Sequence, residues 1–148
     1  HAVFRLYDSV PAGQQSGDDI LDRHLGSAFL RNPTCARHVV EALLHHDEER
    51  YVLQAWCVMP NHVHVLMAVN EKFQLGGIVR SWKMFTTRRI NRELNRGGPV
   101  WAADYFDRYI RDEAHFESTK RYIEMNPVAA GLCERPEDWP FGSAGRKR

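Results

Sequence analysis

Two apolar runs joined by a short turn constrain the fold of this chain most strongly. The runs are Tyr51–Val58 and His62–Val69, and Pro60 with Asn61 lies between them. Proline and asparagine are typical turn residues, and two strand-like runs this close in sequence form an antiparallel hairpin. We therefore expect a β-hairpin in the middle of the chain.

Strand-like and helical segments alternate around this hairpin. The spacing of apolar residues predicts strands over 2–7 and 105–110, and helices over 33–46, 73–94 and 113–126. Asn32 is placed to cap the first helix, and Pro127 is expected to stop the last one, because proline disfavours helical geometry at the residue before it. The order β-α-β-β-α-β-α predicts an α+β fold: a ferredoxin-like βαββαβ unit with an antiparallel sheet, followed by an additional C-terminal helix. The hairpin's second strand would then be central.

Composition sets broad limits on the class of protein. The 148 residues are 43% hydrophobic and 26% charged, which indicates one globular domain over 1–148. No apolar run approaches the roughly 18 residues of a membrane helix, so no membrane partner is expected. The three cysteines are odd in number and form no CxxC pair, which is typical of reduced thiols in a cytoplasmic protein.

His62 and His64 are two residues apart on the hairpin's second strand. Side chains at i and i+2 of a strand share one face, so the two imidazoles form half of a metal site. With eight histidines in the chain, spacing alone favours a simpler reading, in which the pair belongs to a half-exposed sheet face. Two imidazoles alone would suit zinc or another transition ion.

Tyr122 and Asn126 are four residues apart on the last helix and share one of its faces. A tyrosine can attack phosphorus when a metal polarises the phosphate, and an amide carbonyl is a hard oxygen ligand. The simpler alternative is a packed tyrosine beside an asparagine at a helix C-terminus.

Positive charge gathers on the central helix although the whole chain carries a formal charge of only +1. Clustered basic residues indicate an anionic partner such as nucleic acid, and the alternative is a solvated helix face. The candidate DNA-binding residues are Arg80, Lys83, Arg88, Arg89 and Arg92 of this helix, with Arg108 and Arg111 further along the chain.

Several motifs, in order, resemble the REP-associated tyrosine transposases, which are single-tyrosine (Y1) HUH transposases of the IS200/IS605 type. The central one is Ala55–Leu66 (AWCVMPNHVHVL), which contains both histidines. The others are Ser81–Thr86, Val100–Trp101, Tyr105–Arg108, Arg111–Glu113, Tyr122–Leu132 and Asp138–Pro140.

The resemblance implies a function and a role for each candidate residue. His62 and His64 match the two metal-binding histidines, Tyr122 the catalytic tyrosine and Asn126 the third ligand. The metal would be Mg²⁺ or Mn²⁺. Members of this family cut single-stranded DNA at the foot of palindromic REP hairpins, through a 5′-phosphotyrosine link that frees a 3′-OH. We expect an enzyme of this kind, a monomer or homodimer in the bacterial cytoplasm; the alternative is a domesticated hairpin-binding module with little or no nuclease activity.

Overall fold

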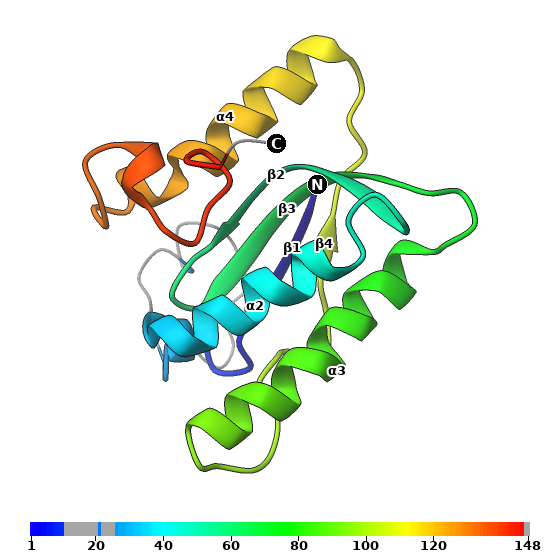
Figure 1. Cartoon of the computed structure of the whole chain (residues 1–148). Coiled ribbons are helices and arrows are strands. Elements are labelled where there is room, and N and C mark those ends of the chain that lie inside the picture. Colours follow the sequence, from blue (N-terminus) through cyan, green and yellow to red (C-terminus); the bar gives the residue numbers. More distant parts are fainter. Residues whose placement is uncertain (11–20, 22–25, 147–148) are drawn as a thin grey trace.

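The computed structural model describes residues 1–10, 21 and 26–146, and its elements follow the expected α+β order (Figure 1). Part of the long connection over 8–32 lies outside the described residues. Among the described residues, no helix combines the length and the apolar character needed to cross a membrane. The elements are β1 (Ala2–Arg5), a 3-10 helix η1 (Phe29–Arg31), α2 (Pro33–His45), β2 (Tyr51–Val58), β3 (His62–Val69), α3 (Leu75–Glu93), β4 (Phe106–Asp107), α4 (Glu113–Ala129) and a 3-10 helix η2 (Pro136–Asp138).

The four strands form one antiparallel sheet in the order β2-β3-β1-β4. The predicted hairpin is confirmed, because β2 pairs with β3 from Tyr51↔Val69 to Val58↔Val63. The predicted ferredoxin-like arrangement is confirmed too, since β1 and β3 occupy the two central positions. The strand that carries both histidines therefore lies in the middle of the sheet.

Helices cover both faces of this sheet (Figure 1). Helices α2 and α3 pack on one face over the main core, which includes Val63 and Val65. Helix α4 packs on the other face, where its Ile123 joins a smaller apolar cluster with Leu66 of β3. Because successive side chains of a strand alternate between faces, His62 and His64 point to the α4 side.

The end of α4 differs from the prediction. Pro127 does not stop the helix, which continues to Ala129. The stop comes from Gly131, which has φ of 75°. Its N–H donates to the carbonyl of Val128, and the next N–H, of Leu132, donates to Pro127. This is a Schellman motif, in which a left-handed glycine satisfies the last helical carbonyls.

The fourth strand is shorter than predicted, with only Phe106 and Asp107 in regular pairing. Among the described strands, this edge strand pairs only with β1, and residues 102–105 bulge out between its regular pairing and a single bridge further along β1. Trp101 forms a bridge with Leu6, and pairing resumes where Phe106 lies opposite Val3. Four residues on one side of the ladder thus face two on the other, which bends an edge strand outward.

Candidate active site

The two histidines are completely buried, and each has its Nδ1 atom engaged by another side chain. His62 Nδ1 lies 2.7 Å from Oδ1 of Asn61, and His64 Nδ1 lies 3.0 Å from Nε2 of His1. The two imidazole centroids are 4.9 Å apart. An imidazole that donates a hydrogen bond from Nδ1 keeps its Nε2 lone pair for a metal. The Asn61 oxygen can only accept, so this contact favours Nε2 as the coordinating atom of His62, and the contact with His1 does the same for His64 when His1 accepts.

Helix α4 brings Tyr122 to the same place. Its ring meets that of His64 edge-on, with centroids 5.7 Å apart and planes at 88°. Ile123, the next residue, is buried against the sheet and anchors the helix there. The Tyr122 side chain itself is 41% exposed, so a phenol oxygen beside the histidines remains accessible to a large substrate.

Asn126 follows one helical turn after Tyr122 and is only 3% exposed. Its Oδ1 atom is buried and has no hydrogen-bond partner among the residues that the structure describes. An unsatisfied buried carbonyl is costly, and a bound cation would satisfy it.

These donors fit a divalent cation. His62, His64 and Asn126 offer two imidazole nitrogens and one amide oxygen. Within the described part of the chain, no group of three or more His, Cys, Asp or Glu residues could hold a metal. Two imidazoles with an amide oxygen differ from the closed sulfur and imidazole sites of structural zinc, and the hard oxygen donor would be compatible with Mg²⁺ or Mn²⁺.

A cavity of about 640 Å³ opens beside these residues, between α4 and the β1–β4 edge of the sheet. Tyr122 forms part of its wall, together with Val3 and Arg5 of β1. Arg5 lies 3.6 Å from Asp104, which also lines the cavity. The candidate nucleophile therefore faces a space large enough for a nucleotide.

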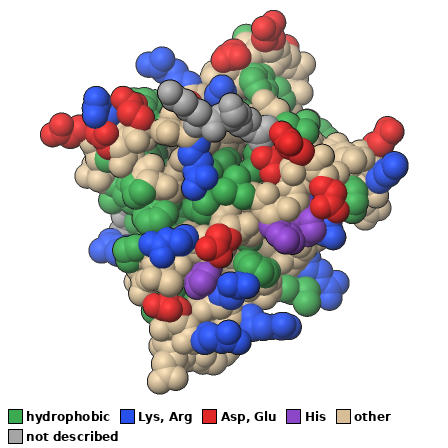
Figure 2. Space-filling view, viewed as in Figure 1, with side chains coloured by type: hydrophobic (Ala, Val, Ile, Leu, Met, Phe, Trp, Pro, Cys, Tyr) green, Lys and Arg blue, Asp and Glu red, His purple; other side chains and the backbone are tan. Residues whose placement is uncertain are grey.

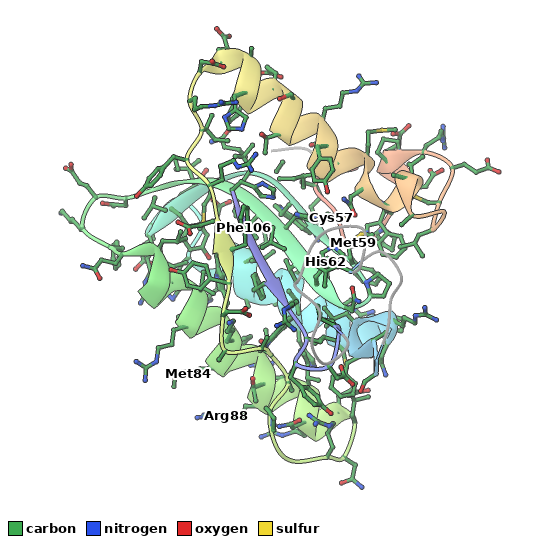
Figure 3. All side chains as sticks on the ribbon, turned by 180° about the vertical axis from the view of Figure 1, so that it is seen from behind. Cys57, Met59, His62, Met84, Arg88 and Phe106 are labelled. Atoms are coloured by element: carbon green, nitrogen blue, oxygen red, sulfur yellow. The ribbon has the colours of Figure 1, made fainter. Side chains whose placement is uncertain are left out.

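The predicted DNA-binding residues fall into separate groups. Arg108 lines the cavity, with its guanidinium 5.9 Å from the Phe106 ring centroid. Arg111 is exposed just before the N-cap of α4, outside the cavity lining. The exposed arginines of α3 lie on the opposite side of the sheet. Lys and Arg side chains gather there, in the lower half of Figure 2. The exposed arginines of this helix are Arg80, Arg88, Arg89 and Arg92. Figure 3 shows Arg88 and Met84 directed away from the body of the molecule.

Lys83 differs from the other residues of this group. Its Nζ atom donates to the carbonyls of Ala102 and Asp104, both at 2.8 Å, so its ammonium group holds the bulge before β4. Desolvation by burial lowers the pKa of Lys83, and the neighbouring Asp104 opposes that shift. The structure thus gives this lysine an internal partner.

Four residues near the site were not predicted from the sequence: His1, Arg5, Asn61 and Phe106. Asn61 belonged to the central motif, but its role depends on a contact with the next side chain. His1 and Arg5 share the Val3 face of β1, and this periodicity would have placed them on one face of the sheet. Pairing between β1 and β3 then brings that face to the histidines.

A family model and two known proteins match this chain in sequence. Residues 34–126 match the family model described as IS200-like transposases. A Haemophilus influenzae protein assigned to the REP-associated tyrosine transposases is 30% identical over 102 residues, covering 62% of this chain and 58% of that protein. An uncharacterized protein of the same species is 26% identical over 100 residues, covering 51% of this chain and 54% of its own length. The chain therefore spans somewhat more than half the length of these relatives.

A solved structure of a REP-associated tyrosine transposase bound to a REP hairpin has the same fold. It matches with a TM-score of 0.63 at 18% identity, over 98% of this chain and 75% of that one. The resemblance inferred from the motifs is confirmed by these matches.

Proposed function

Because the chain belongs to the IS200-like transposase family, we propose that it cuts and rejoins single-stranded DNA at the foot of palindromic, REP-type hairpins. The observation that carries this proposal is the convergence of Tyr122 with His62 and His64 on one face of the sheet, beside an open cavity. A module that only bound hairpins would not require this set of residues. The hairpin substrate is inferred from the relatives, whose names refer to REP sequences.

In the proposed reaction, the phenol oxygen of Tyr122 attacks the scissile phosphorus. The bond between phosphorus and the 3′ oxygen breaks, the tyrosine gives up its proton, and the 3′ oxygen leaves as a hydroxyl. The product is a 5′-phosphotyrosine, which keeps the ester energy, so rejoining to a 3′-OH needs no ATP. The edge contact with His64 fixes the direction of the Tyr122 ring before attack.

The reaction also requires that the negative charge of the scissile phosphate be neutralised. A divalent ion held by His62, His64 and Asn126 would neutralise charge on the non-bridging oxygens. Arg5 and Arg108 line the same cavity and would add positive charge along the DNA strand. His1 and Asn61 hold the two imidazoles in orientation through their Nδ1 atoms.

The test uses labelled single-stranded palindromes from the host genome with Mg²⁺ or Mn²⁺. The unmodified protein should form a covalent adduct that migrates with the protein in a denaturing gel, and EDTA should abolish it. Tyr122→Phe should fold and bind the hairpin but form no adduct. Tyr109→Phe is the matched control, because Tyr109 is 89% exposed and should be dispensable.

Two results would contradict the proposal. An adduct formed by Tyr122→Phe would place the nucleophile elsewhere. Tight hairpin binding by the unmodified protein without an adduct, with either metal, would instead identify a hairpin-binding module. Undiminished cutting in EDTA would overturn the metal assignment alone.

A further inference from the structure

Phe106 lies in register with the candidate metal site although it is far from it in sequence. It pairs with Val3 of β1, and Val3 in turn pairs with His64 of β3. Residues directly opposite one another in a sheet have side chains on the same face. Phe106 and His64 therefore stand in one row on the α4 side, two strands apart, which is about 10 Å.

The Phe106 side chain is 52% exposed, which is unusual for a large apolar group in a sheet. It lies on the edge strand β4 (Figure 3) and lines the same cavity as Tyr122. Val3, between Phe106 and His64, is almost completely buried and forms the cavity floor. An aromatic ring is thus presented to the open space beside the nucleophile.

Positive charge accompanies this ring. The Arg108 guanidinium lies 5.9 Å from the ring centroid, and Arg5 extends into the cavity from β1. An aromatic face flanked by cations complements a nucleotide, whose base is a flat ring and whose phosphate is an anion. Arg5 already has Asp104 as a counterion, 3.6 Å away, so the cation that a nucleotide phosphate would meet beside this ring is chiefly Arg108.

We propose that Phe106 is a stacking platform for an unpaired base of the DNA strand that carries the scissile phosphate. This inference rests on the proposed function and adds a base-binding subsite to it. Stacking on an aromatic ring tolerates any base, so the subsite would hold the strand close to Tyr122 without selecting its sequence. It would also favour single-stranded over duplex DNA, because a paired base has its faces covered by its neighbours.

The experiment compares two oligonucleotides with the full chain in EDTA, so that no cutting interferes. One is a fluorescein-labelled thymidine oligomer about twelve nucleotides long, and the other is an abasic oligomer of equal length and charge. The unmodified protein should bind the thymidine oligomer more tightly in fluorescence anisotropy. Phe106→Leu, which keeps an apolar side chain but removes the ring, should weaken thymidine binding about five- to a hundredfold and leave abasic binding unchanged.

Two control variants sharpen the comparison. Phe106→Trp keeps an aromatic face and should retain thymidine binding. Tyr109→Leu removes a ring from the same segment that does not line the cavity, and should bind both oligomers like the unmodified protein.

Three results would overturn the inference. They are unchanged thymidine binding by Phe106→Leu, an equal loss on both oligomers, and an equal loss in Tyr109→Leu. The test is independent of cutting: base binding that depends on Phe106, in a protein that forms no Tyr122 adduct, would overturn the proposed reaction and leave this subsite in place.

Discussion

The Nδ1 atom of His62 lies 2.7 Å from Oδ1 of Asn61, the residue immediately before it. Both side chains are fully buried at the start of β3. Because the amide oxygen accepts only, it holds the imidazole proton on Nδ1 and leaves Nε2 for coordination. Asn61, a residue of the hairpin turn, therefore also fixes the tautomer of His62.

We predict that Asn61→Ala weakens binding of Mn²⁺ about 10- to 100-fold, the usual effect of removing a hydrogen-bond partner of a metal ligand. Isothermal titration of the metal-free protein would measure this directly. Asn61→Asp keeps an acceptor oxygen and should retain most of the affinity. Unchanged Mn²⁺ affinity in Asn61→Ala, with normal unfolding, would show that this contact does not prepare a metal ligand.

A second prediction concerns Lys83, whose ammonium group bonds two carbonyls of the bulge before β4. Lys83→Met leaves those carbonyls without their donor, so the free energy of unfolding should fall by about 1–3 kcal/mol. Urea denaturation measures the change. Arg80→Met is the control, because Arg80 is exposed on the same helix and should change stability by less than about 0.5 kcal/mol. Equal stability of the two variants would mean that the lysine does not support the bulge.

The parts of the fold that local pattern controls could be predicted from the sequence. The hairpin bounds Tyr51–Val58 and His62–Val69 match the structure, because long apolar runs flank a short turn. Asn32 caps α2 as expected, accepting from the N–H groups of Thr34 and Cys35. The pairing of His62 with His64 on one face follows from the strand period alone.

Two kinds of feature could not be predicted: the choice between two helix-ending residues that lie close together, and features that depend on contacts distant in sequence. To predict the end of α4, one has to choose between Pro127 and Gly131 as the residue that stops the helix. The left-handed glycine is the one that ends it. The length of β4 depends on its pairing with β1. Lys83 shares its helix with exposed arginines, and only the bulge at 102–105 gives it a different partner.

A third prediction concerns thiol chemistry. Burial raises the pKa of Cys35 to about 11 and raises the pKa of Cys57 even further. Both thiols therefore stay protonated at pH 8, where only the thiolate reacts. Partial burial and the nearby carboxylates of Asp138 and Glu137 raise the pKa of Cys133 as well. Its thiol is only half-buried, however, so the native protein should react faster with a colorimetric disulfide reagent at this residue than at the two buried thiols.

A serine variant and urea test which thiols react in the native protein. Cys133→Ser should abolish the fast reaction of the native protein, and urea should expose the remaining thiols of either form. Rapid reaction of a second native thiol would contradict the burial of Cys35 or Cys57.

The last prediction concerns the exposed arginines of α3, which lie on the face of the sheet opposite Tyr122. A strand in the cavity cannot reach them without passing an edge of the sheet, so we expect them to contact phosphates of a separate part of the DNA, such as a hairpin stem. Replacing Arg88, Arg89 and Arg92 with glutamine should weaken hairpin binding equally for REP-type and scrambled sequences. The slope of log K against log salt should flatten by about 0.7 to 0.9 per lost phosphate contact. Removing the same charge at the exposed Arg31, Arg37 and Lys72 is the control. If the two triple variants bind with equal affinity and slope, the α3 arginines form a solvated helix face and the hairpin stem lies elsewhere.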